Sequence, residues 1–342
     1  DLVFSVNYFG AVSEGCMNCG IKYVVWTCDS PLISMHHESV FNDCNYIFIF
    51  DKVNYHIFKN MGHSRVYYLP LAVNVSRIDR VLAESKDIRN GSLDGISDCS
   101  SVSGSDSKCI NGYTPEFLSD ITFVGSLYEK NSYDEIKDNM SDYLQGYFDA
   151  LMLAQIDIFG ENIADRLLTP EILYELSEII ELKQDERSFS NLALVFSTTF
   201  LGFKIASLER KICLAKLAEH HMVKLYSDQH GLVIPGVINE GSVDYHKDMP
   251  KVFNRSKINL NFTIRNIRSG IPLRVWDVLG AGGFMLTNFQ AEIPMYFENG
   301  KDLVFFESTD DLVRKADYYL EHEEQRCAIA RNGYEKVKKY HS

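Results

Sequence analysis

The stretch INLNFTIRNIRSGIPLRVWDVLGAGGFMLTNFQAEIPMYFENGKDLVFF, residues 258–306, decides the fold of this chain. Its first apolar run, Ile258–Phe262, predicts a strand buried on both faces. Ile271-Pro272 then marks the start of a helix, because proline at the first helical position loses no hydrogen bond and has its φ preset. Glycines within residues 280–283 end that helix and let the chain turn into a second strand, Phe284–Thr287. This order of elements is typical of an α/β fold with a parallel sheet.

The start of the predicted helix carries a concentration of positive charge. Free backbone amides and the positive end of the helix dipole are expected beside Gly270, and such a helix terminus is a natural seat for phosphate. Arg265, Arg268 and Arg274 crowd the same end in a protein that is otherwise acidic. The contrast predicts an anionic ligand here, although three arginines so close together also suit a solvated surface.

Asp277 is the carboxylate within this predicted helix. A carboxylate cannot be a phosphate ligand, and beside a bound nucleotide its sensible role is to accept hydrogen bonds from a ribose diol. Taken alone, Asp277 also fits a surface or capping position, and Trp276, on an apolar face of the helix, also fits a purely structural place in the core. Their coincidence with the glycine and proline positions favours a site for a nucleoside diphosphate.

Three longer segments carry a resemblance to a known family. They are FVGSLYEK (123–130), ERKICLAKLAEHHMVKLYS (209–227) and SKINLNFTIRNIRSGIPLRVWDVLGAGGF (256–284). Shorter stretches near the amino end match as well, among them SVNYFG, YVVWTCDSPL and FDKVNY. The chain resembles the nucleotide-sugar half of GT-B glycosyltransferases, and more closely their CgeB-like, spore-maturation branch.

The resemblance implies a bacterial enzyme that moves a sugar from a nucleotide-diphosphate sugar to an acceptor, either a protein or a cell-surface or spore-surface glycan. It implies no cofactor besides this donor substrate. In GT-B enzymes a glycine-bearing turn after the first strand of the second domain, followed by a basic residue, lies at the donor phosphates. Gly125, Ser126 and Lys130 are similarly placed, although many retaining members have arginine where Ser126 stands. The nucleotide-sugar site implied by the resemblance comprises these three residues with Arg265, Arg268, Ser269, Gly270, Arg274 and Asp277.

The chain departs from the best-known retaining GT-B enzymes, which carry two glutamates eight positions apart in this region. Counting back eight positions from Asp277 gives Ser269, which is not acidic. The resemblance therefore supports nucleotide binding more directly than catalysis, and it leaves retention or inversion open. A non-catalytic sugar-nucleotide-binding or spore-surface protein is an alternative, as is another GT-B chemistry such as sugar-nucleotide epimerisation.

Inverting transfer would require a general base for the acceptor hydroxyl. Asp29, in WTCDSP at the end of the predicted strand Ile21–Thr27, is the candidate catalytic residue, with His36 and His37 as weaker substitutes. An Asx-turn or a cap before Ser30-Pro31 explains Asp29 at least as well.

The sequence contains no convincing acidic metal motif. Cys16 and Cys19 have the spacing of a metal or redox pair, but no second pair or paired histidine accompanies them. We therefore expect no metal site, with the helix end, arginine and lysine supplying the electrostatics of the reaction instead.

The chain is long enough for two domains, each with its own core. Residues 1–75 alternate strand-like and helical runs and predict an acceptor domain of Rossmann-like type. Because residue 1 already lies at the edge of an apolar strand, we expect earlier units to be missing, and the exposed sheet edge leaves a homodimer open. Residues 76–119, with many Ser, Gly and Asp, predict a flexible linker. Residues 120–342 predict a second Rossmann-like domain that binds the nucleotide sugar, with a helical insertion at about 133–200.

Overall composition limits the class of partner. Of the 342 residues, 46% are hydrophobic and 24% charged, as in ordinary soluble proteins. A net charge of −13 argues against a nucleic-acid partner, because binding a phosphate backbone needs a basic surface. No stretch approaches eighteen consecutive apolar residues and no basic start precedes an apolar run, so the sequence predicts neither a membrane span nor a signal peptide. We expect a cytoplasmic protein.

Overall fold

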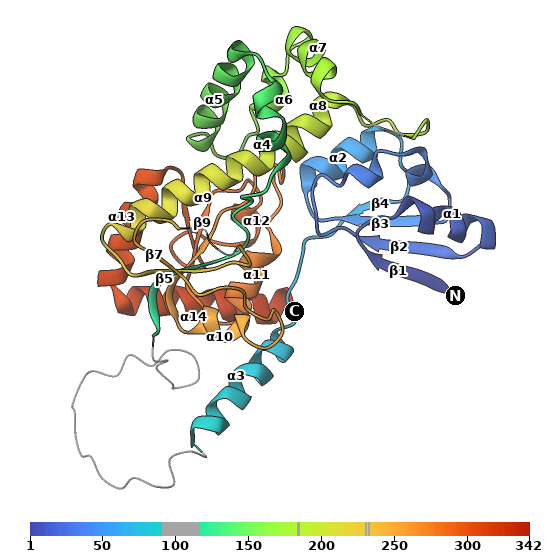
Figure 1. Ribbon diagram of the computed structural model, residues 1–342. Helices are drawn as coiled ribbons and strands as arrows, with labels where there is room; N and C mark the ends of the chain where they lie inside the picture. The colour runs from blue at the N-terminus through green and yellow to red at the C-terminus, as the bar shows by residue number, and fades with distance from the viewer. Residues whose placement is uncertain (91–116, 183–184, 230, 232) are drawn as a thin grey trace, which may run out of the picture.

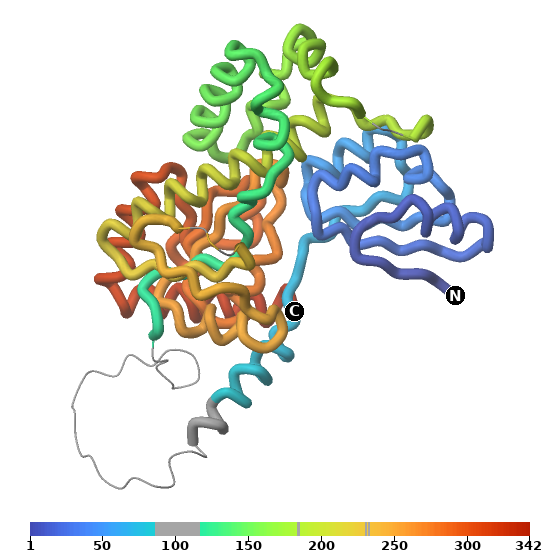
Figure 2. Tube along the Cα trace, in the orientation of Figure 1, coloured from blue at the N-terminus to red at the C-terminus, as the bar shows by residue number. Residues whose placement is uncertain are grey.

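A computed structural model describes residues 1–90, 117–182, 185–229, 231 and 233–342. They form two α/β units, each built on a parallel sheet, with a group of helices beside them (Figure 1). The predicted α/β class with two parallel sheets is confirmed. The carboxyl end of the chain returns to the segment between the units, where the Val73 amide donates a 3.2 Å hydrogen bond to the His341 carbonyl (Figure 2).

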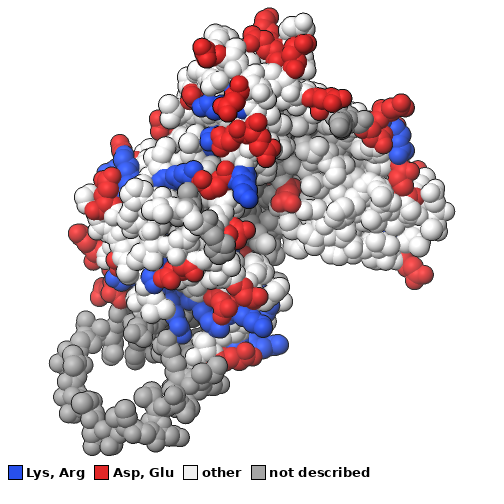
Figure 3. Space-filling view, in the orientation of Figure 1, with Lys and Arg blue, Asp and Glu red and all other residues white. Residues whose placement is uncertain are grey.

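The first sheet contains four parallel strands in the order β1 (Leu2–Val6), β2 (Lys22–Trp26), β3 (Asn45–Ile49) and β4 (Val66–Tyr68). One face packs against α1 (Gly10–Cys19), α2 (Lys52–Asn60) and two short 3-10 turns, Ile33–Met35 and Glu38–Phe41. The opposite face is apolar at the edge strand, where Leu2, Phe4 and Val6 are more than half exposed. Figure 3 shows few charged side chains over this unit.

The second sheet contains six parallel strands that the chain visits from the centre outwards. Their order is β10 (Val304–Phe306), β9 (Met285–Asn288), β8 (Ser256–Asn261), β5 (Ser119–Val124), β6 (Val223–Tyr226) and β7 (Val237–Asn239). After β5 the chain adds strands on one side, and from β8 onwards it adds them on the other. The strand order therefore reverses between β5 and β8, and in open α/β sheets ligands bind outside the carboxyl ends of the strands at such a point.

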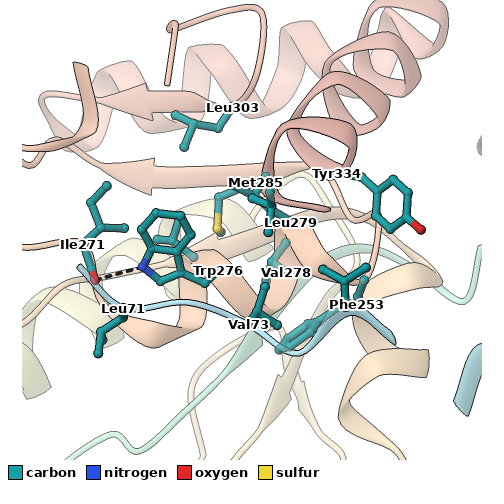
Figure 4. Close-up of a cluster of buried hydrophobic side chains, with 14 of the residues drawn as sticks. Leu71, Val73, Phe253, Ile271, Trp276, Val278, Leu279, Met285, Leu303 and Tyr334 are labelled. Carbon is teal, nitrogen blue, oxygen red and sulfur yellow. Dashed lines mark hydrogen bonds between the residues drawn. The ribbon is translucent and has the colours of Figure 1, made fainter. Parts of the chain in front are cut away.

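Helices cover both faces of the second sheet. One face packs against α9 (Gly202–Ala218) and α13 (Thr309–Glu321). The other packs against α10 (Met249–Asn254), α11 (Leu273–Gly280) and the last helix, α14 (Glu323–Tyr340), while α12 (Ile293–Tyr296) follows β9. Trp276 lies in this second core with no exposed surface, and its indole nitrogen donates a 3.3 Å hydrogen bond to the Ile271 carbonyl (Figure 4). The purely structural interpretation of Trp276 therefore accounts for its place.

A third hydrophobic core lies among the inserted helices. They are α4 (Ser132–Ile136) with a 3-10 turn at Lys137–Asn139, α5 (Asp142–Ile156), α6 (Ala164–Leu167), α7 (Pro170–Ile179) and α8 (Leu192–Val195). Buried side chains such as Leu144, Phe148 and Phe196 pack together there. These helices fall within the segment where the sequence predicts a helical insertion.

The helix α8 continues through a π-helical segment, Phe196–Leu201, into α9. The Asn191 side chain caps this continuous helix at its start by accepting a 2.8 Å hydrogen bond from the Leu194 amide. Residues 192–218 are long and apolar enough to cross a membrane by length and composition alone, yet half of the apolar window is buried inside the protein. A core helix of a globular domain has the same properties.

The expected linker is helical in its first part. Residues 75–90 form α3 (Val75–Asn90), because the Asn74 side chain accepts a 2.9 Å hydrogen bond from the Arg77 amide and Val75 and Ile78 are buried against the second core. The prediction of a linker from residue 76 is thus wrong over this helix. Residues 91–116 of the expected linker lie outside the described residues.

Candidate functional site

The loop after β8 leads into α11, and Val124 at the carboxyl end of β5 lies in the same hydrophobic core as Ile271 and Val275. Pro272 is the N-cap of this helix, with φ −69° and ψ 154°, so it precedes the first helical residue instead of occupying that position. In the first turn the Val275 amide donates to the Pro272 carbonyl at 3.0 Å, whereas the amides of Leu273 and Arg274 precede the first bond within the helix. The point where the strand order reverses therefore presents free donors and the positive end of a helix dipole.

Arg210 of α9 spans the carboxyl ends of the two central strands. Its Nη1 donates to the Ser126 carbonyl at 2.6 Å and its Nη2 donates to the Phe262 carbonyl at 2.7 Å. The guanidinium also lies 4.8 Å from the centre of the Tyr128 ring. Its Nε has no hydrogen-bond partner among the described residues. A buried cation is thus fixed at the edge of the sheet, and its Nε–H group is left to donate a further hydrogen bond.

Arg274, in the first turn of α11, is a second cation near this edge and is partly buried. Its pKa is lowered, first by burial, and the like charge of Arg210 contributes to the lowering. The attraction of Asp277 opposes both effects. The charges of the two guanidinium groups therefore influence each other, which leaves this region positive.

Asp277 is buried, with only 4% of its surface exposed. Its Oδ1 accepts a 2.9 Å hydrogen bond from the Tyr245 hydroxyl, and its Oδ2 lies 3.7 Å from Nη1 of Arg274. Burial raises the pKa of Asp277, while the Arg274 charge and the Tyr245 hydrogen bond oppose the rise. The carboxylate borders a small hollow, too narrow to hold a water molecule, whose walls also include Arg77 and Phe253.

The turn after β5 joins the same edge. The Gly125 amide donates to the Tyr226 carbonyl at 3.0 Å, and the Ser126 hydroxyl accepts a 3.1 Å hydrogen bond from the Tyr128 amide. Lys130 is exposed at the end of this turn. The structure therefore brings Ser126 against Arg210, while Lys130 remains a cation on the surface.

Two of the predicted arginines have other partners. Arg265 is 5% exposed, forms a 3.0 Å ion pair with the fully buried Glu209 and lies over the Phe159 ring. Arg268 pairs with Asp165 of the inserted helix α6. In these positions both guanidinium groups brace the inserted helices, so the structure does not bring them to the start of α11 with Arg274.

Ser269 and Gly270 lie in the contact between the two units. The Ser269 hydroxyl is 2.7 Å from Oε1 of Glu292 and 3.1 Å from Oδ1 of Asp51, and Asp51 also accepts from the Ser269 amide at 3.3 Å. A Cβ atom added at Gly270 would stand 2.8 Å from the Phe50 ring, so only glycine allows this close approach. The structure thus places both residues against the first unit.

Asp29 is exposed at the carboxyl end of β2 and is oriented by Asn7. Nδ2 of Asn7 donates to Oδ2 of Asp29 at 2.7 Å. Oδ1 of Asn7 accepts from the backbone amides of Cys28 at 2.8 Å and Asp29 at 3.3 Å. Asn7 has a φ of 65°, and Tyr128, after β5, has a φ of 50°. These are the two non-glycine residues with positive φ in the described part of the chain, and such strain is often held at functional sites.

His36 and His37, the weaker candidates for the general base, both make contacts that stabilise the fold. His36 lies between the rings of Phe58 and Phe189, and burial lowers its pKa. His37 caps the following 3-10 turn by accepting from the Ser39 amide at 3.1 Å. Neither arrangement favours a proton-transfer role over that of Asp29.

Sequence reasoning missed Arg210, Tyr245 and Arg77. A signal existed for Arg210, because it precedes Cys213, Leu214 and Leu217 at helical spacing and is therefore a charged residue on the buried side of α9. Tyr245 and Arg77 had no comparable signal, since the Tyr245 bond to Asp277 and the Arg77 contact with the Tyr245 ring join distant parts of the chain.

The chain is similar to known proteins both in sequence profile and in fold. Residues 210–342 match the sequence profile of a family described as "Glycosyl transferase-like", and no curated protein sequence matches the chain. HepE of Anabaena in complex with UDP is similar to this chain with a TM-score of 0.50 and 8% identity, over 100% of this chain and 75% of that one. Its complex with UDP-glucose gives a TM-score of 0.51 at 7% identity, over the same shares of 100% and 75%. At this identity the similarity shows the fold, which is the two-domain GT-B fold.

Proposed function

We propose that this chain is a glycosyltransferase that takes a sugar from a nucleoside-diphosphate sugar and transfers it to a protein or surface glycan without a divalent metal. The observation that carries the proposal is the grouping of Arg210, Arg274 and Asp277 with the start of α11 at the carboxyl edge of the second sheet. The glycosyl transferase-like profile over residues 210–342 supports it, as do the UDP and UDP-glucose bound to HepE.

The donor half of the reaction follows from these groups. Charge develops on the diphosphate as the sugar leaves, and preorganised donors at that position lower the barrier. The amides at the start of α11 and the guanidinium groups of Arg210 and Arg274 would supply this stabilisation. Asp277, once it releases one of its present partners, would accept a hydrogen bond from the ribose and fix the nucleoside.

The acceptor half is assigned to the first unit. If transfer inverts the anomeric centre, Asp29 would take the proton of the acceptor hydroxyl, with Asn7 holding its carboxylate in place. The contact of Phe50 with Gly270 brings the carboxyl ends of both sheets together. Donor and acceptor sites at these two edges would therefore face each other.

A non-catalytic sugar-nucleotide-binding protein is the second candidate. The observation that favours it is the state of Ser269, which lies eight positions before Asp277 and is engaged with Asp51 and Glu292 in the contact between the units. No carboxylate is available from that position for the transferred sugar. We also propose, on the resemblance alone, a place in the CgeB-like branch and in the bacterial cytoplasm.

Sugar transfer and donor hydrolysis should be measured with a panel of UDP, GDP, ADP and TDP sugars. The proposed enzyme turns over at least one donor, and Arg274→Gln slows this turnover about tenfold or more. Arg314→Gln, which removes an exposed arginine paired with Asp311 on α13, serves as the matched control and should keep full activity. Nucleotide binding without turnover of any donor would favour the non-catalytic alternative.

A further inference from the structure

We propose that Tyr245 gates the ribose position of the nucleotide site: its hydroxyl holds the Asp277 carboxylate until a ribose hydroxyl replaces it. The inference rests on the proposed function, because it assumes that a nucleotide binds at Asp277. It concerns a residue outside α11 and outside every sequence motif described above. It makes Tyr245 a residue that sets how strongly the site distinguishes ribose from deoxyribose.

Both oxygens of Asp277 already have partners within the chain. Tyr245 donates to Oδ1 at 2.9 Å, and Arg274 lies 3.7 Å from Oδ2. Arg274 is held by its own helix and by a contact of Nη1 with the Met249 sulfur at 2.6 Å. A ribose hydroxyl must therefore replace a partner of Asp277, and the Tyr245 hydroxyl is the partner of the same chemical kind.

The space beside the carboxylate leads to the same conclusion. The hollow has no room for even a water molecule, whereas small-molecule pockets usually measure about 300 Å³ or more. Its walls are Arg77 and Ile78 of α3, Met249, Pro250 and Phe253 of α10, Asp277 of α11, and Tyr245. Tyr245 is the one wall residue outside a helix, and it is only half-buried. It is therefore the wall that can move aside for a ribose hydroxyl to reach Asp277.

The surroundings of Tyr245 hold it in the closed position without burying it. Arg77 donates to the His246 carbonyl at 3.1 Å, and its guanidinium lies 5.4 Å from the centre of the Tyr245 ring. Asp244 accepts hydrogen bonds from the His246 and Lys247 amides at 2.9 Å and 2.7 Å. The backbone of this segment is thus fixed, and displacement of Tyr245 needs only its side chain to turn away from Asp277.

An exchange of one hydroxyl for another has a defined consequence for specificity. A ribonucleotide loses the Tyr245 hydrogen bond as it gains its own, so its net gain is small. A ligand without ribose hydroxyls leaves Tyr245 in place. Removing the tyrosine hydroxyl should therefore strengthen the binding of a ribonucleotide and leave the binding of a dideoxynucleotide unchanged.

Calorimetry with UDP and 2′,3′-dideoxy-UDP tests this gate. Tyr245→Phe should bind UDP about tenfold more tightly than the parent chain, with unchanged affinity for the dideoxy ligand. Tyr334→Phe is the matched control, because the Tyr334 hydroxyl also donates to a carboxylate, lying 2.9 Å from both oxygens of Asp79. It should bind both ligands as the parent chain does.

Unchanged or weaker UDP binding by Tyr245→Phe would overturn the gate, as would an equal change for both ligands. Failure of the proposed function looks different. In that case the parent chain binds none of UDP, GDP, ADP or TDP, and no variant restores binding.

Discussion

At the scale of the residue, Asp277 is where buried charge and proposed function coincide. Replacement by alanine removes the acceptor for a ribose diol, and hydrogen bonds to a charged group contribute roughly 1.5 to 3 kcal/mol each. Because one of these bonds only replaces the Tyr245 hydrogen bond, we expect Asp277→Ala to weaken nucleotide binding by about tenfold or more. Unchanged affinity in calorimetry, with the fold intact by circular dichroism, would contradict the ribose assignment.

The raised pKa of Asp277 also predicts how binding depends on pH. The ionised form accepts the ribose hydrogen bonds, so nucleotide affinity should fall as pH decreases through this raised pKa. Asp277→Asn should lack that component of the pH profile, which separates it from titration of the phosphates themselves. Parallel profiles for the parent chain and Asp277→Asn would count against this assignment.

The raised pKa of Asp277 makes folding stability depend on pH in the opposite direction to nucleotide affinity. Because the folded-state pKa of Asp277 lies above the unfolded value, the folded state binds this proton more tightly. The contribution to stability is fully present below the unfolded pKa and is lost as pH rises through the folded pKa. Low pH therefore favours folding at this position while it removes the ribose acceptor.

Asn7 provides a test of the acceptor half. Asn7→Ala removes the 2.7 Å hydrogen bond to Asp29 and the support of the Cys28 and Asp29 amides. If Asp29 is the general base, kcat should fall about tenfold or more while KM for the donor stays nearly constant. Steady-state kinetics with varied donor concentration checks this, and an unchanged kcat would remove Asp29 from the mechanism.

At the scale of the element, helix α2 couples the two units through its first turn. The Lys52 amide donates to Glu292 at 2.7 Å, the Val53 amide donates to the Ser269 hydroxyl at 3.1 Å, and the Asn54 amide donates to Asp51 at 3.1 Å. Two of these three caps come from the second unit. The helix end is therefore complete only while the units stay in contact.

Glu292→Ala should destabilise the protein by about 2 to 4 kcal/mol, because it leaves the Lys52 amide and the Tyr68 hydroxyl without their buried acceptor. Differential scanning calorimetry measures the effect as a lower Tm. Glu298→Ala, which removes an exposed glutamate paired with Lys301, is the control and should change the Tm little. Equal Tm values for the two variants would show that this contact does not couple the units.

Elements with local signals could be predicted from the sequence, and side-chain partners from distant segments could not. The apolar runs gave strands close to their observed bounds, and the proline and glycine positions located α11. Arg265 was expected at the anion site from its position in the sequence, yet Glu209 of α9 buries it in an ion pair. The contact of Tyr245 with Asp277 joins residues whose proximity no spacing rule indicates.

At the scale of the whole molecule, the positive charge at the edge of the second sheet is set against a net charge of −13. The proposed mechanism assigns to Arg210, Arg274 and a helix end the role that a divalent ion has in metal-dependent transferases. Turnover should therefore persist in EDTA and gain little from added magnesium or manganese. Activity abolished by EDTA and restored by either ion would contradict this assignment.

The most direct test of the nucleotide site is a calorimetric titration of the chain, Arg274→Gln and Arg314→Gln with UDP, GDP, ADP and TDP. The site predicts that the parent chain and Arg314→Gln bind at least one of these nucleotides alike, while Arg274→Gln binds it roughly tenfold to a hundredfold more weakly through loss of charge-assisted hydrogen bonds. Equal affinity in all three proteins, or no binding of any nucleotide by the parent chain, would contradict a nucleoside diphosphate site at the start of α11.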